Sequence, residues 1–345
     1  MNKYFPFLLF LIIYARVFSQ QEEYLVNVIP VPAEHKVTIN IGRQLFTEFL
    51  YPDSLEKPAL YPVYAPDQQV ITRGFPFQTR EGEPTDHPHH IGIWFNYENV
   101  NGLDFWNNSY AIPADKKQLY GWIRVTHILK TKSGKEGELT YMANWVDDHN
   151  NVLLTETTTF IFTAKEDQRI IDRITKLSAK QDISFKDAKD GLLGLRVCHE
   201  LELPSAQPKK YQDNKGNTTI VAADNLPAGN YLTSEGKQGD SAWATRAAWC
   251  LLYGKKGDDT LSIGIIDHPQ NPGYPTFWHA RGYGLFAANP LGQKIFSNGK
   301  ETLDFRLKNS EETTFRYRIV IAAGKKRIPN STLEQLTKEF AKIGN

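Results

Sequence analysis

Three of the nine histidines fall within four positions, in the run Asp86-His87-Pro88-His89-His90. Histidine changes charge most readily near neutral pH and is the commonest metal ligand, so the run predicts proton transfer or metal binding. Pro88 fixes its own φ and biases His87 toward an extended backbone. Alternate side chains of an extended run share a side, which places His87 and His89 together and His90 opposite. The alternative, histidines that only hydrogen-bond a turn, is less favoured because perturbed titratable groups concentrate at functional sites.

A bound metal is an open alternative for this run. His87 and His89 have the spacing of an extended H-x-H pair, which can chelate one divalent ion. Asp86, Asp104 or Glu200 would add a carboxylate, as in zinc and iron sites. The H-x-H spacing alone is a weak signal, so chemistry without a metal is favoured.

A second stretch, residues 267–290, carries similar ingredients. It begins with the same Asp-His-Pro order, at Asp267 and His268, and three prolines within seven residues stiffen the loop that follows. His279 and Arg281 share one side of an extended segment. The arginine offers a planar fork of donors for a carboxylate or vicinal hydroxyls. Taken alone, this stretch fits a structural loop better than a site.

Together, the two stretches predict one shared pocket. Each joins an Asp-His-Pro turn to further histidines, aromatic residues and an apolar strand that contains glycine. We expect His89 or His90 within reach of His279, and Arg281 positioning an oxygen-rich ligand. We also expect Trp94, Trp106 or Trp278 near the rim of this pocket.

The elements that must position these residues are predicted to be β-strands. Ile91 to Phe95 directly follows the histidines and is apolar, as a buried strand is. Period-two segments separated by Gly, Asn, Asp and Lys clusters predict antiparallel sheets packed face to face. These segments are Trp122–Ile128, Leu139–Val146, Thr155–Thr163, Ile170–Ile174, Leu193–Leu203, Trp249–Tyr253, Leu261–Asp267, Leu303–Leu307 and Thr313–Ala322.

One helix is predicted, from Ser331 to Ile343. Ser331 and Glu334 form a capping-box pattern, and apolar residues follow at helical spacing. Two long polar loops, residues 204–213 and 222–241, are of the length that is often functional. The fold class predicted is therefore all-β, a large antiparallel sandwich with a C-terminal helix.

The first nineteen residues predict a secretory signal peptide. Lys3 gives a positive start, Phe5 to Tyr14 is apolar, and Val17-Phe18-Ser19 offers a cleavage site. The apolar run is shorter than the roughly 20 residues that a spanning helix needs. We expect a periplasmic or secreted, soluble chain of one domain, residues 20–345, without further membrane insertion.

The amino-acid composition limits the classes of molecule that the protein is expected to bind. The formal net charge is +1, and no basic stripe appears, so nucleic acid is an unlikely ligand. Aromatic residues make up 12% of the chain, which fits sugar recognition and an aromatic β core about equally. The two cysteines, Cys198 and Cys250, lie in apolar runs. Two buried free thiols are slightly favoured over a disulfide bond.

Several of these stretches resemble a known family, the secreted bacterial proteins labelled "methane oxygenase PmoA-like". The matching stretches cover nearly the whole mature chain, and the resemblance implies an exported protein of polysaccharide-degrading bacteria. It also implies a fold similar to the galactose-mutarotase-like supersandwich, whose concave face binds sugars. Copper-dependent methane oxidation is rejected, because that membrane subunit spans the bilayer several times. The stretches are 71–74, 86–90, 100–106, 191–197 and 278–290.

Two functions remain in view. The favoured one is a carbohydrate-active enzyme that uses histidines for acid–base or metal-assisted chemistry, of lyase or epimerase type rather than a two-carboxylate hydrolase. The alternative is a non-catalytic carbohydrate-binding or scaffold protein of a polysaccharide-utilisation system. The predicted catalytic residues are His89, His90, His279 and Glu200. The predicted substrate-binding residues are Arg73, Asp104, Trp106, Arg196, His268, Trp278 and Arg281.

Overall fold

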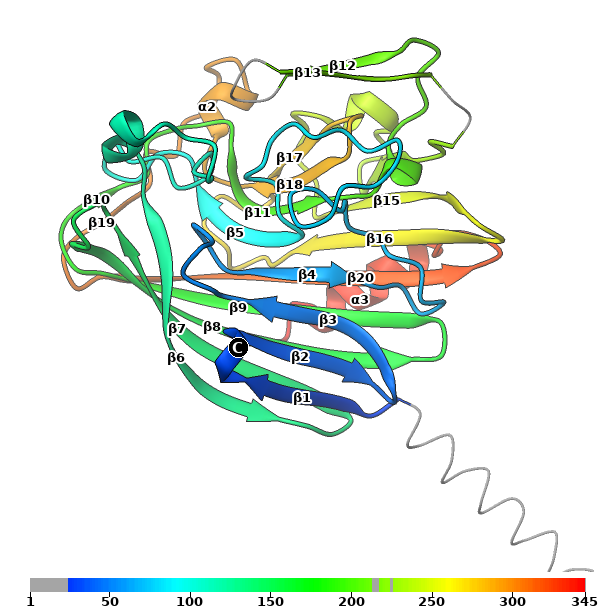
Figure 1. The fold of residues 1–345 in the computed structure, drawn as a ribbon, viewed down its shortest axis with the longest axis horizontal. Coiled ribbons are helices and arrows are strands. Elements are labelled where there is room, and N and C mark those ends of the chain that lie inside the picture. The colour runs from blue at the N-terminus through cyan, green and yellow to red at the C-terminus, as the bar shows by residue number, and fades with distance from the viewer. Residues whose placement is uncertain (1–23, 213–216, 224–225, 345) are drawn as a thin grey trace, which may run out of the picture.

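A computed structural model describes residues 24–212, 217–223 and 226–344. Two wide antiparallel β-sheets of eight strands each lie face to face and form a sandwich (Figure 1). The predicted signal peptide lies outside the described residues. Among the residues described, no helix combines the length and the apolar character needed to cross a membrane.

The first sheet has the spatial order β1-β2-β3-β4-β5-β11-β18-β17. Its strands are β1 (Val26–Val31), β2 (Lys36–Ile41), β3 (Gln44–Leu50), β4 (Ala59–Val63), β5 (Ile93–Tyr97), β11 (Gly191–Arg196), β18 (Leu285–Asn289) and β17 (Phe277–Ala280).

The second sheet has the order β14-β15-β16-β20-β9-β8-β7-β6. Its strands are β14 (Asn230–Thr233), β15 (Trp249–Lys256), β16 (Asp259–Asp267), β20 (Glu312–Gly324), β9 (Gln168–Ala179), β8 (Val152–Lys165), β7 (Glu136–Val146) and β6 (Trp122–Lys132).

Short elements complete the chain. Two small pairs, β10 (Ile183–Ser184) with β19 (Arg306–Leu307) and β12 (Lys209–Gln212) with β13 (Thr218–Val221), lie outside the large sheets. The helices are α2 (Gln293–Phe296), α3 (Asn330–Phe340) and the 3₁₀ turns η1 (Pro32–Glu34), η2 (Ala114–Leu119), η3 (His199–Leu201) and η4 (Gly239–Ala242).

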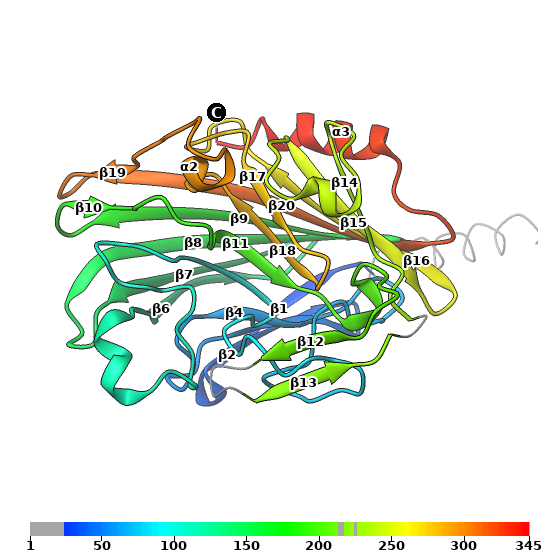
Figure 2. The same cartoon turned by 90° about the horizontal axis from the view of Figure 1, so that it is seen from above.

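The predicted fold class is confirmed as a large antiparallel β-sandwich with a C-terminal helix. The period-two pattern is clearest in β8, where threonines, aromatic and aliphatic residues alternate between buried and half-buried positions. Inner faces of both sheets share one core. Helix α3 covers the outer face of the second sheet through Leu333, Leu336 and Phe340 (Figure 2).

Several boundaries differ from the prediction. The predicted strand from Leu193 to Leu203 ends at Arg196, because the chain turns into η3. Of the segment Leu303–Leu307, only Arg306 and Leu307 pair. The predicted loops contain β12, β14 and η4. The β12–β13 hairpin, the pairing of β14 with β15 and the turn η4 therefore give these polar stretches regular structure.

The predicted helix exists but its predicted cap is wrong. The helix begins at Asn330 after Pro329, and no side chain caps its first turn, so Ser331 and Glu334 form no capping box. It ends at Phe340 rather than at Ile343, and the residues after Phe340 form a turn. The favoured state of the cysteines is confirmed, since Cys198 and Cys250 are both free and buried.

A charged pair lies inside the sandwich core. Arg173 of β9 donates to the Glu156 carboxylate at 2.7 Å, and both side chains are almost fully buried. Tyr141 and Trp145 also donate to Glu156, at 2.6 and 2.8 Å. The Arg173 guanidinium lies 4.6 Å from the ring of Phe95, a residue of the opposite sheet. The network therefore joins the two sheets, and each of its polar side chains has a hydrogen-bond partner within the network.

We expect Arg173→Met to destabilise the protein by about 3–5 kcal/mol, because it leaves the Glu156 carboxylate buried without its cation. The matched control is Lys176→Met on the same strand. Lys176 pairs with Glu312 at an exposed site, where an ion pair contributes only about 0–1 kcal/mol. Urea unfolding of both variants tests the claim. Equal effects of the two substitutions would show that the buried pair is not special.

Candidate functional site

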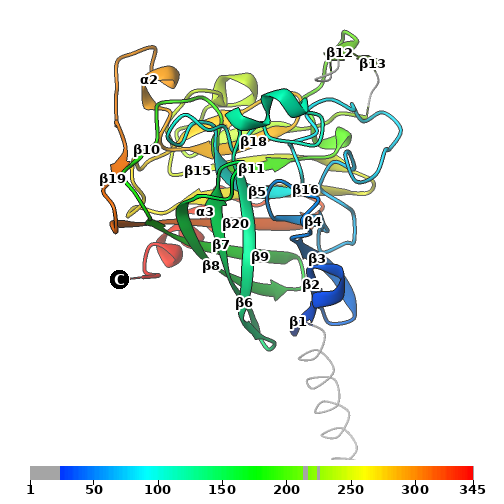
Figure 3. The ribbon, with the colours of Figure 1, turned by 60° about the vertical axis from the view of Figure 1, so that its left-hand side comes forward.

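The four strands β5, β11, β18 and β17 present one face away from the second sheet, called here the site face. Phe95, Leu193, Trp278 and Ala288 lie on the opposite face and belong to the core between the sheets. The site-face side chains form a separate apolar cluster instead. Figure 3 shows that loops and the β12–β13 hairpin lie over this end of the first sheet.

Strand register decides which residues share the site face. Directly paired residues of antiparallel strands point to the same side. One row across the strands runs Trp94, Gly194, Ala287, His279. In the next row Arg196 pairs with Leu285, and the backbone N–H of Arg281 donates to the Leu285 carbonyl. Both arginines and His279 therefore share one surface with Trp94.

The floor of the site face is aromatic. A Cβ built on Gly194 would lie 2.5 Å from the Trp94 ring and 2.8 Å from Trp106, so only glycine lets both indoles lie over β11. Trp94 and Trp106 are fully buried. The expectation that they lie near a rim is therefore wrong. Lys57 donates to the Trp106 carbonyl at 2.7 Å, and burial lowers the pKa of Lys57 to about 7.

The histidine run forms a tight turn and is not extended. His90 N–H donates to the His87 carbonyl at 3.0 Å, and His87 has a left-handed backbone with φ of 46°. The rings of His87 and His90 consequently stack at 4.8 Å, and those of His89 and His90 meet edge-on at 4.3 Å. The predicted alternation of sides is wrong, because the turn gathers all three imidazoles into one cluster.

Arg73 holds this turn in place. Its guanidinium donates to Asp86 Oδ1 at 3.0 Å and to the His87 carbonyl at 2.8 Å. His87 Nδ1 contacts the other Asp86 oxygen. Burial alone would raise the pKa of Asp86, but the His87 hydrogen bond and the charges of Arg196 and Arg73 outweigh it and lower that pKa. Asp86 is therefore a buried carboxylate committed to anchoring.

Arg196 is a fully buried cation of the site face with unused hydrogen-bond donors. Its side chain is 0% exposed. Nη1 lies 3.3 Å from His90 Nδ1, while Nη2 lies 3.7 Å from Asp86 and 4.0 Å from Glu202. Within the described residues, Nε and Nη2 have no hydrogen-bond partner. A buried guanidinium with unused donors is costly unless a polar group meets it.

The two predicted stretches meet at Tyr283. Its ring stacks on His87 at a centroid distance of 5.7 Å. The Arg196 and Arg281 guanidinium carbons lie 4.8 and 5.8 Å from the same ring. A direct approach of His89 or His90 to His279 stays a prediction. Trp94 and His279 are three strands apart in the register, about 14 Å at the usual strand spacing.

His279 forms a pair with Asp190. Its Nδ1 lies 3.4 Å from Asp190 Oδ1, and the imidazole is 2% exposed. Burial, with Lys189 and Arg281 nearby, lowers the pKa of His279 to about 3. Burial raises the pKa of Asp190 to about 7. At neutral pH the imidazole is therefore neutral, and it lies beside a carboxyl group whose pKa is raised.

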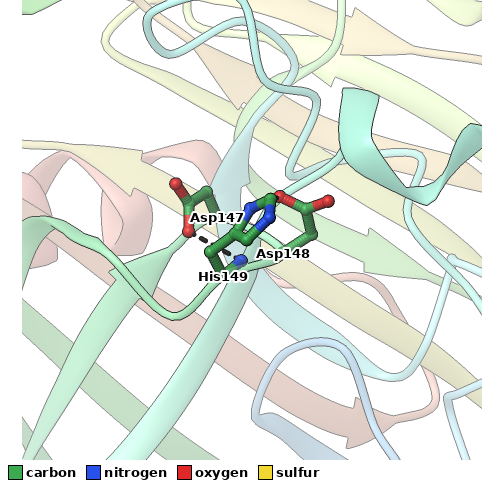
Figure 4. A group of neighbouring side chains, drawn as sticks. All are labelled: Asp147, Asp148 and His149. Carbon is green, nitrogen blue, oxygen red and sulfur yellow. Dashed lines mark hydrogen bonds and ion pairs between the residues drawn. The ribbon is translucent and has the colours of Figure 1, made fainter.

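The proposed metal ligands do not converge. Among the described residues, the donor atoms that come within 4.8 Å of one another as a group of three belong to Asp147, Asp148 and His149, not to Asp86, His87 and His89. That group lies in the β7–β8 turn (Figure 4). There Asp147 already accepts hydrogen bonds from the backbone N–H groups of His149 and Asn151. The clustering of these three side chains is therefore explained by the turn itself.

Other predicted residues lie elsewhere. His268 packs edge-on against Phe340 of α3, at 5.1 Å, and is thus held beneath the C-terminal helix. Trp278 lies in the core between the sheets, since it points opposite to His279. Glu200 pairs with Lys256 at 3.0 Å. Asp104 accepts two hydrogen bonds from Asn107.

The structure also adds four residues to the predicted set. Tyr283 lies in the β17–β18 turn, two positions after Arg281, within the stretch that the sequence had singled out. Asp190, Glu202 and Lys57 carried no sequence signal, because only the fold brings them to the site face. Glu202 pairs with Lys209 at 2.9 Å and lies 4.0 Å from Arg196.

Comparison with known proteins gives a family but no activity. A model of the family of unknown function DUF6807 matches residues 36–337. That family carries no PmoA-like label, although its function is equally unassigned, as the resemblance implied. A search of curated proteins gave no match.

Solved structures share the general fold at low similarity. The GH36 α-galactosidase AgaB from Geobacillus stearothermophilus is 11% identical, with a TM-score of 0.42 over 87% of this chain and 41% of that chain. The galactosidase domain of the α-galactosidase-sucrose kinase AgaSK is 7% identical, with a TM-score of 0.43 over 87% and 42%. Heparan sulfate lyase HepC from Pedobacter heparinus is 10% identical, with a TM-score of 0.31 over 94% and 43%.

The chain thus spans about two fifths of the length of these structures. At these TM-scores the similarity assigns no activity and no residue role to this chain.

The buried imidazole of His279 predicts a pH effect on stability. Its pKa of about 3 in the folded protein lies below the ordinary value of 6.5, so the unfolded chain binds the proton first. The resulting stability is complete above pH 6.5 and is lost as the pH falls toward 3. Relative to His279→Asn, the wild type should lose about 1.6 kcal/mol between pH 6.5 and pH 5.

Urea unfolding at the two pH values measures this difference. The control is His149→Asn, at a side chain that is 78% exposed and lies in the β7–β8 turn. A gap for His279→Asn that stays constant would mean that the folded protein protonates this imidazole as readily as the unfolded chain.

Proposed function

We propose, from the premise that this chain belongs to the family of unknown function DUF6807, that it is an exported carbohydrate-active enzyme that moves protons on a sugar. The reaction class is removal of a proton from a sugar carbon by a neutral base, as in a lyase or an epimerase. The observation that carries this proposal is the pair of His279 and Asp190 on the site face, beside Arg281.

The pair has the properties that a general base needs. A base must be unprotonated at working pH, and the neutral imidazole of His279 meets that condition. Once it takes a proton, the imidazolium needs a nearby anion, and Asp190 lies 3.4 Å away. Burial raises the pKa of Asp190 to about 7, so this carboxyl group titrates near neutral pH. The proposed roles are therefore His279 as base and Asp190 as its charge partner.

A polyhydroxylated ligand fits the remaining polar groups. Buried polar atoms are normally hydrogen-bonded, so an accumulation of unpaired ones points to a polar ligand or water. On and above the site face, several buried atoms have no hydrogen-bond partner among the described residues. They are His89 Nδ1, Trp94 Nε1, Arg196 Nε and Nη2, Tyr211 Oη and His279 Nδ1.

Two-carboxylate hydrolysis is less well supported. Such enzymes use a pair of free carboxyl groups on either side of the scissile bond. The buried carboxylates nearest the histidine turn, Asp86 and Glu202, are already paired with Arg73 and Lys209. Glu200, also predicted to be catalytic, pairs with Lys256. The histidines therefore remain the better acid–base groups. Export rests on the predicted signal peptide.

Assays of purified protein on plant and algal glycans, with and without a chelator, test this function. We expect activity without added metal and a fall in kcat/KM of about 100–10,000-fold in His279→Asn, the usual contribution of general base catalysis. The kcat/KM should rise with pH through about 7, as Asp190 ionises. Asp190→Asn should abolish that rise.

The control variant is His149→Asn, whose exposed side chain lies in the β7–β8 turn. It should retain wild-type kcat/KM and pH dependence. Glycan binding without any turnover, weakened but not abolished in His279→Asn, would instead support a carbohydrate-binding or scaffold protein. Activity that is unchanged in His279→Asn would refute the proposed base.

A further inference from the structure

The buried carboxylates Asp86 and Glu202 are each paired with a cation. Arg73 and Asp86 form one buried pair at 3.0 Å. Glu202 is paired with Lys209 at 2.9 Å, and His199 lies 3.4 Å from the same carboxylate. Asp86 and Glu202 are thus each paired with a cation other than Arg196.

Arg196 is the first surplus cation. It approaches Asp86 and Glu202 no closer than 3.7 and 4.0 Å, beyond hydrogen-bond distance. It is also fully buried, and two of its nitrogens lack a hydrogen-bond partner among the described residues. A fully buried guanidinium strongly favours a second anion, since its charge is weakly screened there.

Arg281 is the second surplus cation. Within the described part of the chain, its guanidinium makes no hydrogen bond or ion pair, and its contacts are the rings of Trp243 and Tyr283, at 5.5 and 5.8 Å. The nearby Asp190 lies 3.8 Å from Lys189, so those two together add at most one charge of each sign. Arg281 therefore keeps its full charge beside the proposed base.

The two surplus arginines act at one place. Arg196 and Arg281 lie in the same row of the site face, with Leu285 between them, and both guanidinium groups lie within 6 Å of the Tyr283 ring. Arg73 and Lys209 are already paired with Asp86 and Glu202, so Arg196 and Arg281 are left without a hydrogen-bonded carboxylate among the described residues.

We infer that the sugar bound on the site face is anionic, with its acidic group held between Arg196 and Arg281 beside Tyr283. Guanidinium forks bind carboxylate and sulfate oxygens in pairs of hydrogen bonds, so a uronic acid or a sulfated sugar has the required chemistry. This inference rests on the proposed function and names its substrate class.

A carboxylate at this place also makes the proposed chemistry easier. His279 would take the proton from the carbon next to the carboxylate, and the electron pair of the broken C–H bond would move into the carboxylate as an enediolate. Arg196 and Arg281 would stabilise the charge that develops there. In a lyase the neighbouring C–O bond then breaks and its oxygen takes up a proton. In an epimerase a proton returns to the opposite side of the same carbon.

The test uses pairs of glycans that differ only in charge. Polygalacturonate, alginate and glucuronan are compared with their carboxyl-reduced counterparts, and sulfated galactans with their desulfated ones, by calorimetric titration of the full chain. We expect at least one acidic polymer to bind at least tenfold more tightly than its neutral counterpart, with affinity falling as salt rises. Preference for uronates or for sulfated galactans identifies the acidic group.

Arg281→Gln should reduce this discrimination, because it weakens binding of the acidic polymer far more than binding of the neutral counterpart. The control is Arg306→Gln in β19, a strand that lies outside the two large sheets. This arginine is 65% exposed, and the variant should bind glycans as the wild type does. Thermal unfolding of each variant verifies that it is folded.

Two outcomes separate this inference from the proposed function. Equal affinity for charged and neutral polymers, unchanged in Arg281→Gln, would overturn the anionic substrate and leave a neutral-sugar enzyme standing. Failure to bind any glycan of either kind would overturn both.

Discussion

The antiparallel register of β5, β11, β18 and β17 is the constraint on which the site depends. Paired residues must share a face, so fixing Trp94 opposite Gly194 also fixes Ala287 and His279 on that side. A slip of one residue would turn His279 into the core and Trp278 out of it. The aromatic core between the sheets opposes such a slip, because it would bury an imidazole and expose an indole. The packing of one face thus positions the chemistry of the other.

Buried charge is the second organising element, and it acts in two different ways. In the core, Arg173 and Glu156 satisfy each other and join the sheets. On the site face, Arg73 is likewise matched by Asp86, but Arg196 is left partly unmatched. Natural proteins keep unmatched buried charge chiefly where function requires it, because it opposes folding. The contrast between the two networks is therefore the clearest structural sign of a site.

The fold and part of the site were predictable from the sequence, for identifiable reasons. Period-two alternation revealed the strands, and residue types alone singled out the histidine run and the stretch that contains His279 and Arg281. Their meeting at Tyr283 follows from pairing of β11 with both β5 and β18, which local pattern does not encode. For the same reason His268 was misplaced, since its Asp-His-Pro order describes a turn and not the element that the turn packs against.

The carboxylate that lies near Arg196 was the hardest part of the site to predict. Glu200 and Glu202 are two residues apart, and only the turn of η3 decides that Glu202 faces Arg196 while Glu200 faces Lys256.

The positive surroundings of the histidines couple ligand binding to proton transfer. Desolvation and neighbouring cations together lower the pKa values of His89, His90 and His279. An anion placed between Arg196 and Arg281 would cancel part of that positive field and raise these pKa values toward their ordinary range. His279 would then become a stronger base only after an acidic ligand is bound. The arrangement that keeps the imidazole neutral in the free protein would therefore also make its proton affinity respond to the charge of the ligand.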